Sequence, residues 1–187
     1  MTTVLTDVVV AGLAFVGTTF DDFVSLTAQL LVTDPLRYRR VWWAHALALA
    51  TVAALATALG AALGAVPIRW LAVLALAPLS FAIYSWRHRR ASAPKLRRGA
   101  ITTFVVTLGL GGDNVAVWVP LLRPHDLTKT SVTLITFIAL EFLLLFAARA
   151  FTHLPRLVRW ADTYSPMVAP FVYGALGVLV LFECHLL

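Results

Sequence analysis

Two short polar motifs interrupt long apolar stretches of this chain. The first reads Gly17-Thr18-Thr19-Phe20-Asp21-Asp22, and the second reads Gly109-Leu110-Gly111-Gly112-Asp113-Asn114. Each motif places an Asp, followed by Asp or Asn, inside a segment long enough to cross a bilayer as a helix. A charged side chain at the centre of a membrane helix costs about 2.5–3.5 kcal/mol. We therefore interpret the two motifs as the halves of one polar site buried in the membrane.

The side chains of these motifs offer oxygen ligands to a cation. The candidate metal ligands are Asp21, Asp22, Asp113 and Asn114. An all-oxygen set of this kind suits Mg²⁺, Ca²⁺ or Mn²⁺. Three carboxylates in a medium of low dielectric repel one another, so at least one is expected to hold a proton until a cation binds. The ligand set therefore favours exchange of a divalent cation for protons.

Three further residues are candidates for metal binding or proton relay. Thr18 and Thr19 place hydroxyl groups beside the first acid pair, and Glu141 lies near the middle of a later apolar segment. Glu141 is expected either to join the site or to form an internal ion pair. His45 lies one turn inside an apolar segment, where a histidine with a satisfied hydrogen bond is expected rather than a ligand.

The composition defines the class of protein. Of the 187 residues, 60% are hydrophobic and 13% are charged, and the mean hydropathy is +0.87. Apolar segments predict six transmembrane helices, at about 8–32, 41–63, 68–86, 100–122, 131–148 and 166–182. We expect an all-α membrane protein, with a kink at Pro78 in the third span.

The two motifs also indicate an internal repeat. A shift of 92 residues aligns Asp21 with Asp113 and Asp22 with Asn114. Each half then holds three spans, so the second half must cross the membrane in the opposite sense, as in many secondary transporters. The prediction is a single transmembrane domain, 1–187. It consists of two inverted three-helix repeats, about 1–86 and about 100–187, joined by a cytoplasmic basic loop at 87–99.

A break in the helix is expected at each motif. Adjacent residues on a regular helix point about 100° apart, so neighbouring acids cannot both face one ligand. Gly111 and Gly112 would make a break easy, because glycine adopts backbone conformations that other residues avoid. The other interpretation is that these glycines only permit close packing of helices.

The charges between the spans predict the orientation. The first, third and fifth loops hold three, six and three Lys or Arg residues, against two in the fourth. The positive-inside rule then places these three loops in the cytoplasm and both termini outside. The net charge of +6 is thus assigned to topology and to lipid headgroups rather than to nucleic acid.

The motifs carry a resemblance to a known family. The sequence resembles the cadmium-resistance transporter (CadD-type) family, within the LysE-like superfamily of small membrane exporters. The matching residues are Thr18-Thr19-Phe20-Asp21-Asp22-Phe23, and Gly111-Gly112-Asp113-Asn114-Val115 with Val119-Pro120-Leu121. The resemblance implies a multi-pass protein of the cytoplasmic membrane that expels cadmium, with Asp21, Asp22, Asp113 and Asn114 as cation ligands. Related families move manganese or calcium with similar acidic repeats.

Other functions remain open on the sequence alone. The protein could transport manganese, calcium or another divalent cation, or export a small amino acid. An intramembrane enzyme would need companion motifs such as HExxH, which this sequence lacks, so no catalysis and no cofactor are expected. The chain also has no GxxxxGK[ST] phosphate loop to bind a nucleotide. The expected partners are the cation and the lipid bilayer, and a homo-oligomer is compatible with the sequence.

Overall fold

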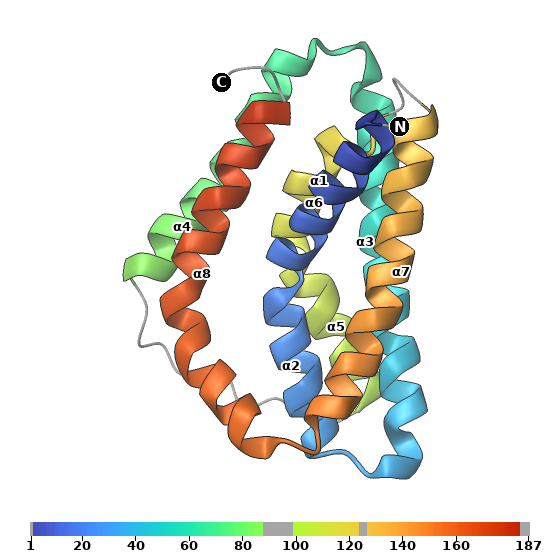
Figure 1. Cartoon of the computed structure of the whole chain (residues 1–187), viewed down its shortest axis with the longest axis vertical. Helices are drawn as coiled ribbons and strands as arrows, with labels where there is room; N and C mark the ends of the chain where they lie inside the picture. The colour runs from blue at the N-terminus through green and yellow to red at the C-terminus, as the bar shows by residue number, and fades with distance from the viewer. Residues whose placement is uncertain (1, 88–98, 124–126, 184–187) are drawn as a thin grey trace.

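The computed structural model describes residues 2–87, 99–123 and 127–183, which form helices joined by short turns (Figure 1). No strand occurs within these ranges, so the all-α prediction is confirmed for them. The basic loop predicted at 87–99 lies almost entirely outside the described residues. The α-helices are α1 (Thr2–Thr18), α2 (Phe20–Leu31), α3 (Tyr38–Ala62), α4 (Leu76–Arg87), α5 (Ala100–Leu110), α6 (Gly112–Leu121), α7 (Leu127–Phe151) and α8 (Pro155–Glu183). The 3₁₀ helices are η1 (Pro35–Arg37), η2 (Leu63–Ala65) and η3 (Ile68–Ala75).

Several of these helices can cross a membrane. Pro35–Ala62 and Leu127–Phe151 are each long and apolar enough to do so alone. Two bent pairs, α1 with α2 and α5 with α6, pass the same test when each pair is taken as one span. By length and composition the described chain therefore offers two to four spans. Six spans stay a prediction.

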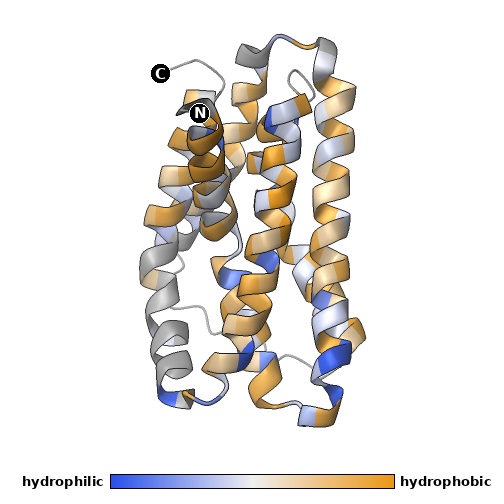
Figure 2. Ribbon diagram, turned by 45° about the vertical axis from the view of Figure 1, so that its right-hand side comes forward, coloured by the Kyte–Doolittle hydropathy of each residue, from blue (hydrophilic) through white to orange (hydrophobic). Residues whose placement is uncertain are grey.

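Hydrophobic residues predominate along the helices (Figure 2), and many of the large apolar side chains are exposed. Leu5, Trp43 and Ile135 are each about two-thirds exposed, at 67%, 67% and 66%. A water-soluble monomer rarely exposes apolar surface on this scale, whereas lipid tails solvate it at no cost. This chain is a membrane protein.

Helices far apart in the sequence pack together in a regular pattern. α3 packs on α5 and α6, whereas α7 packs on α1 and α2. α4 packs on α8, and these two helices lie to one side of the broken pairs (Figure 1). α1 begins and α8 ends at the same end of the bundle.

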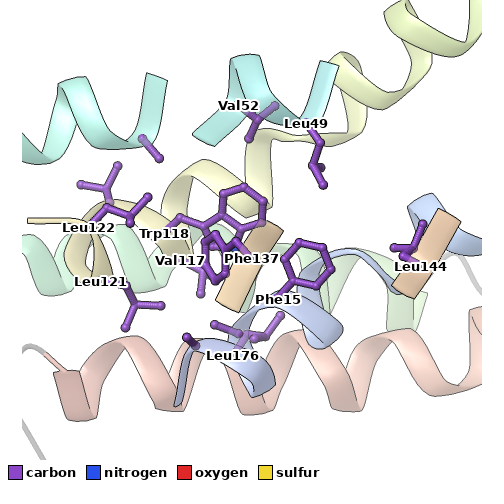
Figure 3. Packing of buried hydrophobic residues seen from close by; sticks show 14 of the residues in the cluster. Phe15, Leu49, Val52, Val117, Trp118, Leu121, Leu122, Phe137, Leu144 and Leu176 are labelled. Atoms are coloured by element: carbon purple, nitrogen blue, oxygen red, sulfur yellow. The ribbon is translucent and has the colours of Figure 1, made fainter. Parts of the chain in front are cut away.

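An aromatic cluster forms the centre of the core (Figure 3). The ring of Trp118 on α6 lies 4.5 Å from that of Phe137 on α7 and 6.0 Å from that of Phe15 on α1, measured between ring centroids. Trp118 is fully buried, and its indole N–H donates to the Thr18 hydroxyl at 3.2 Å. The cluster fixes both broken pairs against α7.

Two predictions about the helices are wrong. The third span is not one α-helix kinked at Pro78, because η3 gives way to α4 at Leu76. Pro78 then lies in the first turn of α4, where backbone N–H groups have no acceptor within the helix, so the lack of an N–H in proline breaks no helical hydrogen bond. The loop predicted around 149–165 is short instead, because α8 begins at Pro155, and proline suits the first position of a helix.

Candidate metal site

The two motifs coincide with the two breaks. The axis bends by 52° between α1 and α2, and by 57° between α5 and α6. At the first break the amide of Thr19 donates to the Phe15 carbonyl at 2.9 Å. At the second, the amide of Gly111 donates to the Thr107 carbonyl at 3.1 Å. These donors and acceptors are related by the shift of 92 residues, and the expected breaks are confirmed.

Gly111 at the second break is explained by the lack of room for a side chain and not by its backbone dihedral angles. Gly111 has φ −68° and ψ 6°, a conformation open to any residue. A Cβ there would lie 2.6 Å from the Val52 side chain of α3, whereas a Cβ at Gly112 would meet nothing within 4 Å. The idea that unusual glycine dihedrals make the break is therefore wrong for Gly111. Close packing of α5 and α6 on α3 is the reason for this residue.

The acids lie in the first turns of the two half-helices that follow the breaks. Asp21 and Asp22 lie in the first turn of α2, and Asp113 lies in the first turn of α6. The Asp21 carboxylate accepts the amide N–H of Asp22 at 3.0 Å, and the Asp113 carboxylate accepts that of Asn114 at 2.9 Å. The positive end of each half-helix offsets part of the cost of burying a carboxylate. Both motifs thus adopt the same local geometry.

The next residue in each motif is buried without a partner. Asp22 is 1% exposed and Asn114 is 0% exposed. Neither carboxylate oxygen of Asp22 has a hydrogen-bond partner, and neither do the amide oxygen and nitrogen of Asn114 or the second oxygen of Asp113. Asp22 lies close enough to Asn114, Asp21 and Asp113 for these side chains to interact. The structure therefore places Asp22 within electrostatic range of the other three predicted ligands.

These side chains do not form a closed cage. Among the residues that the structure describes, no three His, Cys, Asp or Glu side chains lie close enough together to hold a metal ion as they stand. What the structure provides is a group of buried, unpaired oxygen atoms beside two helix breaks. An unpaired buried polar group costs roughly 1–3 kcal/mol, and more when it is charged.

A residue that sequence reasoning missed connects the two acidic motifs. Tyr173 on α8 donates its hydroxyl to Asp21 at 3.5 Å. The same hydroxyl lies within hydrogen-bonding reach of Asp113. Tyr173 therefore joins an acid of one half to an acid of the other. Tyr173 lies near the middle of the predicted span 166–182 and carries no charge, so its type gave no signal of this role.

The threonine hydroxyls are already engaged. Thr18 donates to the Ala14 carbonyl at 2.9 Å, and Thr19 donates to the Phe15 carbonyl at 2.7 Å. Both are buried. These bonds to the preceding turn are typical where a helix bends. The hydroxyl oxygens of Thr18 and Thr19 could still bind a cation through a lone pair.

Glu141 and His45 form a second buried polar group. The His45 ring nitrogen Nε2 lies 3.6 Å from a Glu141 carboxylate oxygen, and Nδ1 lies 3.0 Å from the Thr107 hydroxyl. His45 is fully buried instead of interfacial, because the side chains of Thr107 on α5 and Glu141 on α7 lie against it. Its hydrogen bond was expected and is present. Glu141 lies beside His45 and is also within electrostatic range of Asp22, so its choice between the site and an internal ion pair stays a prediction.

The hydroxyl of Tyr173 can be tested by one substitution. Tyr173→Phe keeps the ring but removes a hydroxyl that contacts both Asp21 and Asp113. We expect metal affinity to fall by about 10–100-fold, the usual effect of losing a group that orients metal ligands. Titration of the purified protein with Cd²⁺ measures this. Tyr84→Phe, at an exposed tyrosine of α4, is the control, and equal effects of both variants would contradict the assignment.

The fold and this site define a helical membrane protein with buried acidic residues at two broken helices. The comparison with known families agrees with this class. A family model described as cadmium resistance transporter matches residues 89–187, and the chain belongs to that family. The match covers the second motif, while the first motif lies before it. No curated protein and no solved structure matches the chain.

Proposed function

We propose that this transporter exports divalent cations, cadmium first among them, by exchange for protons at a site formed by Asp21, Asp22, Asp113 and Asn114. The observation that carries the proposal is the set of buried, unpaired oxygens on Asp22, Asp113 and Asn114. A divalent cation would satisfy these oxygens and remove the repulsion between the carboxylates. Their release of protons on metal binding supplies the exchange.

The packing pattern supports two inverted repeats around this site. Each half contains one broken pair, one long helix and a further helical segment. The long helix of each half packs on the broken pair of the other half, α3 on α5 and α6, and α7 on α1 and α2. The third segments, α4 and α8, pack on each other. This exchange of partners is what a two-fold axis between the halves would produce, with six spans in total.

The energetics of export require coupling to another gradient. Moving a divalent ion outward against an inside-negative potential of 100 mV costs about 4.6 kcal/mol, at 2.3 kcal/mol per charge. The chain has no phosphate-binding loop for a nucleotide. An inward proton gradient can supply this free energy, because the same carboxylates bind either the cation or protons. The metal is thus a substrate rather than a resident cofactor.

The proposed location is the cytoplasmic membrane with both termini outside. The exposed Arg37 ends η1, and the exposed Arg39 and Arg40 lie in the first turn of α3, at the end of the bundle opposite to the start of α1 (Figure 1). Arg149 and Arg156 flank the turn between α7 and α8 at that same end. The positive-inside rule assigns this end to the cytoplasm.

The orientation can be tested with the single cysteine of the chain. Cys184 lies outside the described residues, one residue after the end of α8. If the C-terminus is outside, a membrane-impermeant thiol reagent should label Cys184 in intact cells without permeabilisation. Cys184→Ser is the control for background labelling. Labelling that requires permeabilisation would reverse the proposed orientation.

Transport in vesicles of purified protein tests the proposed function. Cd²⁺, Mn²⁺, Zn²⁺ and Ca²⁺ are offered in parallel, with and without a pH gradient. We expect Cd²⁺ movement that is accelerated by a proton gradient of opposite direction. If Mn²⁺ or Ca²⁺ moves faster than Cd²⁺, that cation and not cadmium is the preferred substrate. If no metal moves but a small amino acid does, the metal exporter is wrong.

A further inference from the structure

A row of polar side chains runs along α2, away from the break. Asp22, Ser25 and Gln29 are spaced by three or four residues, so they share one face of α2, and Thr33 follows four residues later, just past the end of the helix at Leu31. Asp22 and Gln29 are buried, while Ser25 and Thr33 are partly exposed. The Gln29 amide donates to the Ser25 hydroxyl at 3.3 Å, which links adjacent members of the row.

α5 presents polar side chains to this row. Thr103 and Thr107 lie one turn apart, and both are buried. The Thr103 hydroxyl donates to the side-chain oxygen of Gln29 at 2.5 Å, and this bond joins α5 to α2. Thr107 lies one turn nearer the second break and bonds His45. The contact between α2 and α5 therefore contains the Gln29–Thr103 hydrogen bond, and Thr107 continues the row of buried polar side chains on α5 toward the second break.

The row ends at a cavity on the arginine-rich end of the bundle. The cavity has a volume of about 680 Å³ and is lined by Thr33, Asp34 and Thr102 among others. Arg37 and Arg40 also line it and would repel a free cation. Among the lining residues, Thr33 and Thr102 can offer hydroxyl oxygens to a cation, and Asp34 can offer a carboxylate.

The corresponding contact on the other side of the breaks is mainly aromatic, apart from the Trp118–Thr18 hydrogen bond next to the break. Under the shift of 92 residues, Thr107 aligns with Phe15 and Thr103 aligns with Ala11, both buried on α1. There α1 meets α6 through the rings of Phe15 and Trp118, with Phe137 of α7 against both. The two repeats share the geometry of the break but differ in what lies beyond it.

We propose that the contact between α2 and α5 is the path by which the cation reaches Asp22 from the arginine-rich end, and that the Gln29–Thr103 hydrogen bond is the gate that closes it. The inference rests on the proposed transport function. Hydroxyl and amide oxygens along the path replace water ligands of the ion as it moves, as polar groups do in selective pores. Opening needs one side-chain hydrogen bond to break, whereas the opposite side is closed by three packed aromatic rings.

Cross-linking tests whether α2 and α5 must separate. Gln29→Cys and Thr103→Cys are combined with Cys184→Ser, which removes the only native cysteine. A short bis-methanethiosulfonate is expected to lower Cd²⁺ transport at least tenfold, and dithiothreitol is expected to restore it. Each single substitution in the same background should be insensitive to the reagent. If the doubly substituted protein transports equally well when cross-linked, the path lies elsewhere. Absence of transport in the wild type would instead refute the proposed function.

Accessibility tests the gate without any need for transport. Ser25→Cys, in the Cys184→Ser background, places a thiol on the path between Gln29 and Asp22, on the side of the gate away from the arginine-rich end. Adding Thr103→Val should raise its labelling by an impermeant maleimide severalfold from the arginine-rich end. Thr27→Val is the matched control, because the buried Thr27 hydroxyl bonds only its own helix, at the Phe23 carbonyl. Labelling unchanged by Thr103→Val, or labelling from the opposite end, would overturn the inference.

Discussion

Replacement of Asp113 by Asn is expected to abolish cadmium transport. Asn keeps the volume of the side chain and one oxygen but removes its charge. Asp113 is 3% exposed, and one of its oxygens lacks a partner. Loss of a group that only supports a metal ligand costs up to about 100-fold in affinity, so loss of a charged ligand should cost more. Vesicle transport and Cd²⁺ titration of the purified protein measure the two effects separately.

The control for Asp113→Asn is the same substitution at Asp7. Asp7 lies in α1, more than two turns from the break at Thr19, and is partly exposed. Asp7→Asn is expected to leave Cd²⁺ affinity and transport within twofold of the wild type. Asp22→Asn should reproduce the loss seen at Asp113, because each substitution removes one charged ligand from the same proposed site. Transport by Asp113→Asn at the wild-type rate would place the site elsewhere.

Replacement of Gly111 by Ala is expected to destabilise the protein by about 1–3 kcal/mol, the usual effect of overpacking a core. The added methyl would lie 2.6 Å from the Val52 side chain. Val52 is 1% exposed and has little room to move. Thermal unfolding in detergent measures the change in stability.

Two companion variants separate packing from helix breaking at this position. Gly112→Ala should be nearly neutral, because a Cβ there meets nothing within 4 Å. Val52→Ala should relieve the clash, so the double variant Gly111→Ala with Val52→Ala should be more stable than Gly111→Ala alone. Equal loss at Gly111 and Gly112 would mean that glycine flexibility, rather than close packing, supports the break.

Much of the candidate site could be predicted because its polar residues differ in type from the apolar residues around them. Asp21, Asp22, Asp113 and Asn114 are polar residues in apolar segments, and burial in lipid is costly enough to imply a purpose. The breaks followed from the same residues, since adjacent acids on a regular helix diverge. The family membership agrees with the resemblance carried by these motifs.

Other parts of the site depend on tertiary contacts that carry no local signal. Tyr173 reaches the acids from α8, about 150 residues after Asp21 in the sequence, and its repeat-related position holds Phe81, which has no polar group. The packing of Gly111 on Val52 likewise required the position of α3. The row from Asp22 to Thr33 was not predicted, because only the position of Thr103 on α5 opposite Gln29 gives it a meaning.

The most direct test of the account is the number of protons released when Cd²⁺ binds. Titration calorimetry of the purified protein in buffers of different ionisation enthalpy measures affinity and proton release together. The account predicts saturable binding that releases protons, becomes tighter as the pH rises, and is lost in Asp113→Asn. Cd²⁺ binding without proton release, or with unchanged affinity in Asp113→Asn, would contradict it.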